Sequence, residues 1–382
     1  MEQDGYSADR RASVMAYVYL KIEELCSFCK AVFERYGFSA EESAAITDVL
    51  ITADLFGIES HGVQRLVRYA SAIEDGFILP DASIQTVYET PVSAVWEAGR
   101  TMGQIVATAA MKKAIEMAES HGFGIVTVRG SNHYGIAGYY TKMAAEHDLL
   151  GISMTNTEAI AIPTGGKKAM LGTSPIAVCM PADPIPFWFD AATTVVTRGK
   201  LEVYRKKEQP LPEGWAADEN GNDCSDAARV ISNICEKLGG GIFPLGGKDE
   251  RTGSHKGYGL GLIVEIFTSI FSGGTTSPFV KHSGNADTSF CLIALDYGIF
   301  GDKAEIRARM SELLQQLRDS PKADGVDRIY THGEKEWLSE QRVLKTGVPV
   351  NVKTLEEMRR IAQTRQMVPE QYLLHVSNVP FE

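Results

Sequence analysis

Histidine, arginine and tyrosine recur at helical spacing near the N-terminus. His61, Arg65 and Tyr69 stand four residues apart and share one face if their segment is a helix. An imidazole, a guanidinium and a phenol on one stripe could protonate a substrate oxygen and hold a carboxylate through two hydrogen bonds. A solvated polar helix face is the alternative interpretation of the same spacing.

A second histidine, His133, lies in the polar stretch Arg129-Gly-Ser-Asn-His-Tyr-Gly135. The apolar residues 124–128 directly before this stretch predict a strand. Loops at the carboxyl ends of strands commonly carry the reactive groups of α/β proteins. His133 is therefore a candidate acid or base, and a structural histidine is the alternative.

The glycine-rich segment Gly253-Ser-His-Lys-Gly-Tyr-Gly-Leu-Gly261 looks similar to a phosphate-binding loop but does not match one. Lys256 precedes the later glycines and no Ser or Thr follows it, so the order of a P-loop is missing. The spacing of Gly257, Gly259 and Gly261, and the polar residues before them, also differ from a Rossmann fingerprint. A helix N-terminus flanked by Lys256 could still bind an anion, whereas close helix packing is the alternative.

The cysteines do not indicate a redox or metal site. Cys26 and Cys29 have C-x-x-C spacing, but they lie in an apolar helical stretch with no second pair for zinc. The sequence also contains no H-E-x-x-H motif, no G-x-S-x-G motif and no acidic metal cluster. We expect a core position for the pair and no metal.

Periodicity and capping predict the elements that would position these residues. Ser39-Ala-Glu-Glu42 is a capping box that predicts a helix over 40–56, and a second helix is expected over 58–70. A long surface loop is expected over 208–223. Further helices are predicted over 102–120, 139–146, 225–238, 257–272, 302–318 and 354–361, and further strands over 150–154, 175–180, 187–189 and 291–295. The fold class is therefore α/β, with a mainly helical N-terminal quarter.

The composition excludes several classes of partner. The chain of 382 residues is 44% hydrophobic and 23% charged, and its formal net charge is −11. A negative balance disfavours nucleic acid and anionic membranes, and no apolar run has the length of a membrane span. Six scattered cysteines do not form a disulfide framework, so we expect reduced thiols and a cytoplasmic location.

Eight motifs occur in the order typical of one enzyme family. They are Glu59-Ser-His-Gly-Val-Gln-Arg-Leu66, Gly130-Ser-Asn-His-Tyr-Gly135, Ile162-Pro-Thr-Gly-Gly166, Leu171-Gly-Thr-Ser-Pro175, Asp190-Ala-Ala-Thr-Thr194, Pro212-Glu-Gly-Trp215, Lys256-Gly-Tyr-Gly259 and His332-Gly-Glu334. The chain thus resembles the malate/L-lactate dehydrogenase family of the second type, also called L-sulfolactate dehydrogenase-like. This family includes ureidoglycolate dehydrogenase, diketogulonate reductase and a cyclic-imine reductase.

The resemblance implies a nicotinamide cofactor, NAD or NADP, bound without a Rossmann fold. It also implies a homodimer whose active site is shared between subunits. The implied organisation is an N-terminal extension at 1–18, a mainly helical domain at 19–95 plus 302–382, and an α/β cofactor-binding domain at 96–301. Cofactor contacts that carry over from the family are Asp190, Ala191, Ala192, His255, Lys256, Gly333, Glu334 and Lys335.

The resemblance also assigns roles at the reacting centre. Different members give the acid/base role to the histidine matching His61 or to the one matching His133, and both remain candidates. Arg65 matches the arginine on the substrate carboxylate side, and Thr157 matches a substrate-contacting hydroxyl of some members. Tyr69 joins them through its spacing. Two departures from the family pattern, Ser174 for asparagine and Ala191 for methionine, lie at positions that shape the site.

The expected reaction is reversible hydride transfer between NAD(P)H and C2 of a small 2-oxo acid, with malate or lactate as the type of product. Adding hydride to a ketone creates an alkoxide, so a proton donor such as histidine is needed. Two alternatives remain open. One is an NAD(P)H-dependent reductase of a cyclic imine carboxylate, and the other is an inactive dinucleotide-binding sensor.

Overall fold

The computed structural model describes residues 17–281 and 287–381. Contacts divide this chain into two compact units, one of residues 17–81 and 333–381 and one of residues 82–332. These boundaries differ from the ones expected from the sequence, because residues 82–95 and 302–332 group with the α/β unit. Each unit is described by itself.

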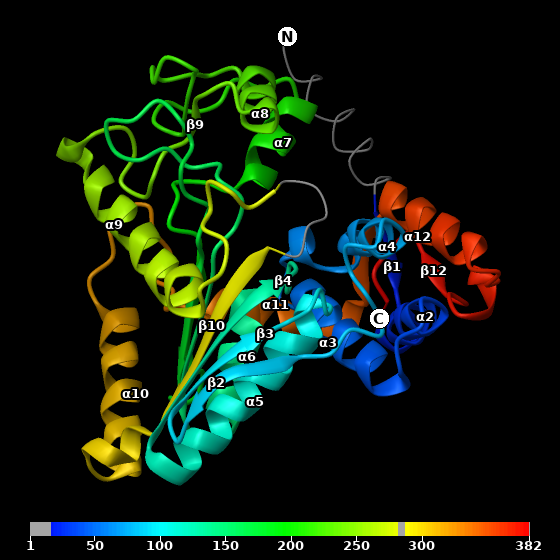
Figure 1. Ribbon diagram of the computed structural model, residues 1–382, viewed down its shortest axis with the longest axis horizontal. Coiled ribbons are helices and arrows are strands. Elements are labelled where there is room, and N and C mark those ends of the chain that lie inside the picture. Colours follow the sequence, from blue (N-terminus) through cyan, green and yellow to red (C-terminus); the bar gives the residue numbers. More distant parts are fainter. Residues whose placement is uncertain (1–16, 282–286, 382) are drawn as a thin grey trace. The chain divides into compact units, whose positions relative to one another are not determined.

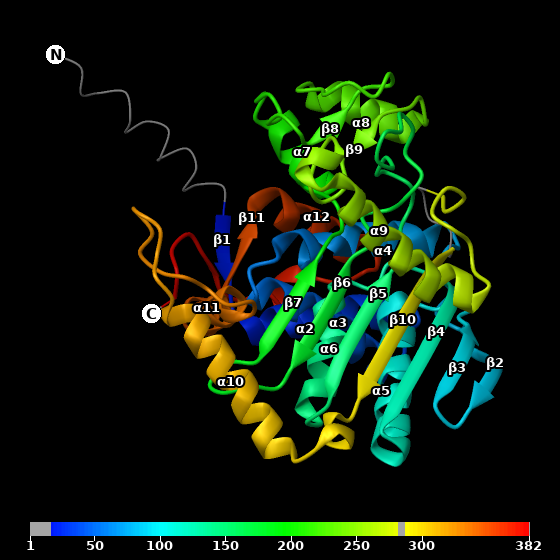
Figure 2. The ribbon, with the colours of Figure 1, turned by 90° about the vertical axis from the view of Figure 1, so that its left-hand side faces the viewer.

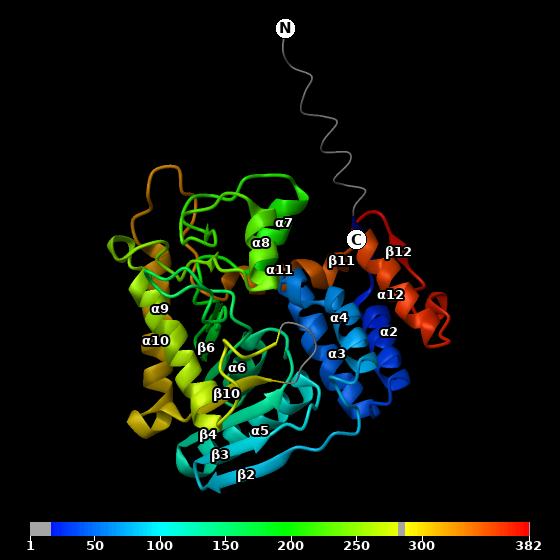
Figure 3. The same cartoon turned by 45° about the horizontal axis from the view of Figure 1, so that its top comes forward.

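The first unit is mainly helical with a small sheet (Figure 3). Helix α2 (Ile22–Arg35) packs against α3 (Ala40–Leu55), and α4 (Leu66–Glu74) packs against α12 (Val352–Thr364). Helix α11 (Glu334–Thr346) contacts α3. Strand β1 (Tyr17–Leu20) lies between β11 (Val348–Asn351) and β12 (Val376–Ser377), and both pairings are antiparallel.

The capping box at Ser39 is confirmed. The Ser39 hydroxyl accepts a hydrogen bond from the backbone N–H of Glu42 at 3.2 Å, and the Glu42 carboxylate accepts one from the N–H of Ser39 at 2.9 Å. These reciprocal bonds explain why α3 begins at Ala40, where the sequence predicted it.

The second unit is built on a sheet of seven strands, seen face-on in Figure 2. Only β3 and β4 run parallel, and the other neighbouring pairs of this sheet are antiparallel. The spatial order is β2 (Gln85–Thr90), β3 (Ser93–Glu97), β4 (Phe123–Ser131), β10 (Thr288–Leu295), β5 (Leu150–Thr155), β6 (Ile176–Met180) and β7 (Phe187–Ala191).

Helices cover both faces of this sheet. Helix α5 (Gly103–His121) packs on β4 and β10, and α6 (Ala137–Glu146) packs on β5 and β6. Helix α9 (Ser254–Glu265) continues into the π-helix η4 (Ile266–Ile270), and both contact the sheet. Figure 1 shows α9 on one side of the sheet and α5 and α6 on the other.

A smaller lobe of the same unit carries its own apolar core. It contains α7 (Arg198–Lys206), α8 (Ala227–Glu236) and the short pair β8 (Ala216–Ala217) and β9 (Gly241–Ile242). The predicted loop over 208–223 belongs to this lobe and is irregular apart from β8. Helix α10 (Lys303–Asp319) lies close to its predicted range.

One predicted helix is only partly correct, and several elements were not predicted. Of residues 58–70, the part before Leu66 forms two 3₁₀ turns, η1 (Glu59–His61) and η2 (Val63–Arg65), and only 66–70 are α-helical, as the start of α4. The hairpin of β2 and β3 was missed because β2 is exposed almost throughout and lacks an alternating pattern. Helices α7 and α11 and strands β1, β11 and β12 were also missed.

The six cysteines are all free thiols. Cys29 is buried in α2, where burial holds the pKa of its thiol well above the usual range, and Cys26 is half-buried one turn earlier. Cys29 therefore has the core position predicted for the pair, whereas Cys26 is only partly buried. In the part of the chain that the structure describes, no helix is long and apolar enough to cross a membrane.

Candidate active site

His61 and Arg65 lie in the first unit on two consecutive turns rather than on one helix. Gly62 separates the turns because its backbone is extended, with φ −82° and ψ −151°. The Ser60 hydroxyl lies 2.9 Å from Nδ1 of His61, and Nε of Arg65 donates to the Ser60 carbonyl at 2.5 Å. The two predicted residues are therefore joined through Ser60 and not through i, i+4 stacking.

The ionisation of His61 is strongly perturbed. Burial, followed by the positive charges of Arg65 and Arg68, lowers the pKa of His61 to about 4. The ring is therefore neutral at pH 7. A neutral imidazole beside a guanidinium is suited to hydrogen bonding a substrate oxygen, and it is a poor source of a proton.

Tyr69 is placed differently from the other two. It lies on α4 one turn after Arg65, but only 1% of its surface is exposed. That burial favours a place in the core of the first unit over a direct contact with substrate.

His133 follows the end of β4 in the second unit and is half-buried. Its Nδ1 accepts a hydrogen bond from the backbone N–H of Gly135 at 3.3 Å. Because an amide can only donate, the neutral ring carries its proton on Nε2. His133 is therefore oriented by the loop through its Nδ1.

Asp190 is at the end of β7, and its carboxylate accepts a hydrogen bond from the N–H of Gly138 at 2.7 Å. Gly138 is in the first turn of α6, where backbone N–H groups favour a negative charge. The Asp190-Ala191-Ala192 segment is thus tied to the helix that follows the His133 loop.

The start of α9 answers the question raised by the glycine-rich segment. Helix α9 begins at Ser254 with no side chain capping it, and His255 and Lys256 are exposed in its first turn. A Cβ at Gly257 would lie 2.2 Å from the Leu245 carbonyl oxygen, whereas Gly259 has nothing within 4 Å. Close packing therefore explains Gly257, and the exposed side chains of His255 and Lys256 are the candidate anion contacts of this turn.

A narrow cleft with a volume of only about 10 Å³, roughly that of one water molecule, lies between segments that are far apart in the sequence. Its lining includes the residues directly after Ala192, the residues directly after Lys256, and Gly172. They are Ala161, Ile162, Leu171, Gly172, Thr193, Thr194, Pro244, Gly257, Tyr258 and Gly261. Two of the predicted cofactor segments therefore border one cleft within the second unit.

Thr157 supports that cleft. Its hydroxyl oxygen accepts a hydrogen bond from the N–H of Thr173 at 3.1 Å. Ser174, the next residue, is fully buried at a left-handed φ of 40°, and its hydroxyl has no hydrogen-bond partner among the described residues. Asparagine tolerates this backbone conformation better than serine does, so the departure from the family pattern has a conformational cost.

The third cofactor segment begins in the first unit. Glu334 is buried as the first residue of α11, where the helix dipole favours its charge, and Lys335 is exposed. Gly333 precedes the helix at a φ of 98°, which glycine adopts without strain. The preceding residue, His332, accepts a hydrogen bond from the N–H of Trp188 at 3.2 Å and so anchors the chain to β7.

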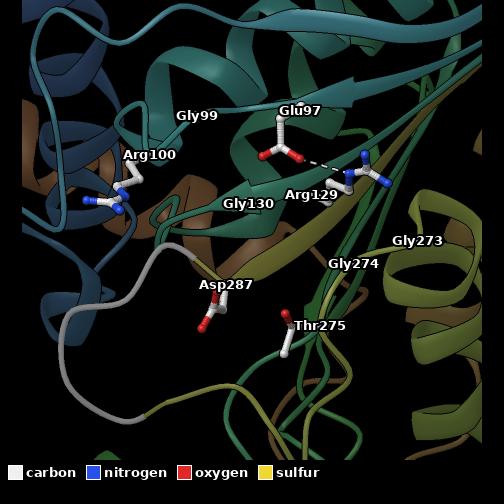
Figure 4. Close-up of a pocket in the computed structure, with 9 residues that line it drawn as sticks. All are labelled: Glu97, Gly99, Arg100, Arg129, Gly130, Gly273, Gly274, Thr275 and Asp287. Atoms are coloured by element: carbon white, nitrogen blue, oxygen red, sulfur yellow. Dashed lines mark hydrogen bonds and ion pairs between the residues drawn. The ribbon is translucent and has the colours of Figure 1, made fainter.

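The structure also contains a cavity that the sequence did not indicate (Figure 4). It has a volume of about 490 Å³ and lies where β3 and β4 end in the second unit. In it, Nε of Arg129 donates to the Glu97 carboxylate at 2.8 Å and Nη1 donates to the Ser272 carbonyl at 2.9 Å. The lining residues are Glu97, Gly99, Arg100, Arg129, Gly130, Gly273, Gly274, Thr275 and Asp287.

This cavity borders the predicted site without containing it. The side-chain amide of Asn132, next to His133, donates weakly to the carbonyls of Arg100 and Thr101 at 3.4 and 3.3 Å. The amide of Asn156, next to Thr157, donates to the Thr275 carbonyl at 2.8 Å. In the sequence, only Arg129, at the start of the polar stretch that contains His133, could have indicated this cavity.

The malate/L-lactate dehydrogenase family model matches residues 20–359 of the chain. The chain belongs to the malate/L-lactate dehydrogenase family. A malate dehydrogenase of Pyrococcus abyssi is 44% identical over 349 residues, which cover 91% of this chain and 95% of that relative. An L-sulfolactate dehydrogenase of Methanocaldococcus jannaschii is 34% identical over 90% of this chain and 96% of its own length.

Solved structures agree with this membership. The crystal structure of malate dehydrogenase from Entamoeba histolytica has a TM-score of 0.89 at 33% identity, covering 92% of this chain and 99% of that one. The resemblance inferred from the eight motifs is therefore confirmed, together with the mixed α/β fold class. Membership in the malate/L-lactate dehydrogenase family supports an oxidoreductase activity on 2-hydroxy acids.

Proposed function

We propose that the protein catalyses reversible hydride transfer between a nicotinamide cofactor, NAD or NADP, and C2 of a small 2-oxo or 2-hydroxy acid of the malate or lactate type. The observation that carries the proposal is family membership over 340 matched positions (20–359) with the reactive side chains present. His61, Arg65 and His133 all stand in their family motifs.

The residues of the second unit fit the phosphates of a dinucleotide. The N–H groups of Ser254 and Lys256 in the first turn of α9 already donate to the carbonyls of Asp249 and Gly253. The proposed phosphate contacts are therefore the exposed side chains of His255 and Lys256 at this positive end of the helix. The seven-stranded sheet is mostly antiparallel, so we infer binding at α9 and β7 rather than at the loop of a Rossmann fold. Asp190, Ala191, Ala192, Gly333, Glu334 and Lys335 complete the proposed set.

The nicotinamide, when bound, supplies or accepts the hydride at C2 of the substrate. Arg65 would hold the substrate carboxylate through a two-pronged hydrogen bond, and Thr157 is the proposed hydroxyl contact. His133 is the proposed proton donor to the new alkoxide. Only its imidazolium form can give up a proton, so the long 3.3 Å hydrogen bond that Nδ1 accepts from Gly135 would have to open when the ring is protonated. The neutral His61 would orient the substrate oxygen. Tyr69 would then support Arg65 from the core.

A homodimer with a shared active site is part of the proposal. Helix α9 and η4 expose a row of large apolar side chains, consisting of Leu262, Ile263, Ile266, Ile270 and Phe271, each between 40% and 58% exposed. A continuous apolar patch of this kind is typical of a surface covered by another protein. A second copy of the chain is the proposed partner.

Two other functions make different predictions. A reductase of a cyclic imine carboxylate would use the same cofactor and similar residues, and a dinucleotide-binding sensor would bind the cofactor without turnover. The test is a panel of 2-oxo acids, 2-hydroxy acids and a cyclic imine carboxylate with both cofactors. We expect turnover of oxaloacetate or pyruvate to exceed that of the imine. Preference for the imine, or cofactor binding with no turnover of any compound, would reject the proposal.

A further inference from the structure

Asp54 is a buried carboxylic acid that faces the turns carrying His61 and Arg65. It lies one residue before the end of α3, and only 6% of its surface is exposed. One of its oxygens, Oδ2, accepts a hydrogen bond from the backbone N–H of Val63 at 2.9 Å. This contact joins α3 to the first residue of η2.

The same carboxyl group occupies the space that a side chain at position 62 would need. A Cβ placed on Gly62 would lie 1.8 Å from Oδ1 of Asp54 and 2.2 Å from Cγ. The φ of Gly62 is −82°, so other residues could adopt its backbone angle. Glycine is therefore required at this position by Asp54 and not by backbone strain.

Backbone hydrogen bonds connect the segment held by Asp54 to His61 and Arg65. Around Gly62, the N–H of His61 donates to the Ile58 carbonyl at 2.9 Å and the N–H of Arg65 donates to the Gly62 carbonyl at 2.9 Å. The Arg65 guanidinium in turn bonds the Ser60 carbonyl. Residues 58–65 are thus one hydrogen-bonded segment whose midpoint rests on Asp54.

Burying a carboxyl group in this position lowers the stability of the fold, because its charged form loses contact with water. Burial raises the pKa of Asp54 to about 8, the hydrogen bond from Val63 opposes that rise, and the negative charge of Glu59 on η1 adds to it. The negative charge of Asp54 also helps to raise the pKa of the buried Cys29 thiol on α2. An apolar or amide side chain would avoid this penalty, and strongly perturbed buried acids are concentrated at functional sites.

We propose that Asp54 is a positioning residue that fixes the geometry of His61 and Arg65 for substrate binding. The proposal rests on the function proposed above for those two residues. Asp54 does not need to contact the substrate. It acts by setting the break at Gly62, so that the imidazole and the guanidinium are presented from consecutive turns.

The test compares D54N and D54A with D48N, an exposed aspartate on the same helix, in the full-length protein. Oxaloacetate reduction is followed from pH 5.5 to 9.5. We expect D54N to lower kcat/KM for oxaloacetate about 10- to 100-fold, the scale of a small misplacement of reacting groups, with an unchanged KM for the cofactor. If kcat/KM of the wild type changes with pH near 8, this change should be absent in D54N. D48N should have the same pH profile of kcat/KM as the wild type.

Two further measurements keep the proposal testable if catalysis is absent or D54N folds poorly. Amide hydrogen exchange over residues 59–65 should be faster in D54A than in D48N, whatever the substrate. G62A should lose activity in the wild-type background and much less in the D54A background, because D54A removes the clash. Unchanged exchange, a wild-type kcat/KM in D54N, or additive effects of G62A and D54A would overturn the proposal. A wild-type protein that reduces no 2-oxo acid but shows the exchange difference would instead reject the proposed function.

Discussion

The Asp190 carboxylate accepts a hydrogen bond of 2.7 Å from the backbone N–H of Gly138. The carbonyl of Gly138 in turn accepts a hydrogen bond of 2.8 Å from the indole N–H of Trp188. Two side chains of β7 therefore hold the first turn of α6, which begins four residues after His133. The strand that carries the proposed cofactor contact and the loop that carries the proposed acid are thus fixed to each other.

Gly138→Ala should destabilise the second unit through this contact. A Cβ at position 138 would lie 2.2 Å from Cζ2 of Trp188, and the indole is held by its own hydrogen bond. Overpacking of this kind typically lowers the free energy of unfolding by about 1 to 3 kcal/mol. Urea denaturation measures the change. Gly259→Ala is the control, since nothing lies within 4 Å of that position. Equal stability of the two variants would contradict the packing argument.

Lys256→Ala should raise the KM for the cofactor by about tenfold or more, with a smaller effect on kcat. The lysine is exposed at the start of α9, and a phosphate bound there would keep the same contact in the ground and transition states. Steady-state kinetics at saturating 2-oxo acid give both constants. Lys112→Ala, on the exposed side of α5, is the control. An unchanged cofactor KM would leave close packing as the sole explanation of the glycine-rich segment.

The apolar row on α9 and η4 should be covered in solution by a second copy of the chain. We expect sedimentation to give a dimer for the wild type and a smaller species for Ile270→Glu, because a charge would be buried in the interface. Ile270 is 58% exposed, and Leu313 on α10, 49% exposed, provides a matched control as Leu313→Glu. A monomeric wild type with full activity would reject both the dimer and the shared site.

The sequence predicted elements where local patterns and packing agree. The capping box at Ser39 and the periodicity before His121 predicted α3 and α5 closely, because these signals act within one helix. The break at Gly62 could not be predicted, since its cause is a carboxyl group on another element. The exposed β2 lacked a periodic pattern altogether.

The candidate site shows the same division. Family motifs supplied His61, Arg65, His133 and the cofactor segments, but no pattern indicated how distant turns would meet. The cleft beside α9 is lined by segments that are far apart in the sequence, and the cavity beside Arg129 includes Glu97 from a hairpin that was not predicted. Such contacts depend on the sheet order, which places β10 between β4 and β5.

Arg65→Lys should lower kcat/KM for the 2-oxo acid by about 10- to 100-fold. Lysine keeps the charge but loses the planar fork that can hold a carboxylate and bond the Ser60 carbonyl, and a charge-assisted hydrogen bond contributes about 1.5 to 3 kcal/mol. The KM for the cofactor should not change. Arg68→Lys, on the exposed side of α4, is the control because it also preserves charge. Equal losses in both variants would remove Arg65 from the substrate site.

The two histidines should divide their roles according to their surroundings. His61, with a pKa of about 4, is neutral throughout the neutral range, so His61→Asn should reduce kcat moderately and keep any ionisation near pH 7. His133→Asn should reduce kcat by about 10² to 10⁴ and abolish that ionisation, as expected for loss of a general acid.

His133→Gln separates proton transfer from hydrogen bonding, because its amide can donate near Nε2 but cannot release a proton. We expect the kcat of His133→Gln, like that of His133→Asn, to lose the ionisation near pH 7. A near-normal kcat in His133→Gln would reduce His133 to a hydrogen-bond donor, and near-normal profiles in both Asn variants would reject histidine as the proton donor.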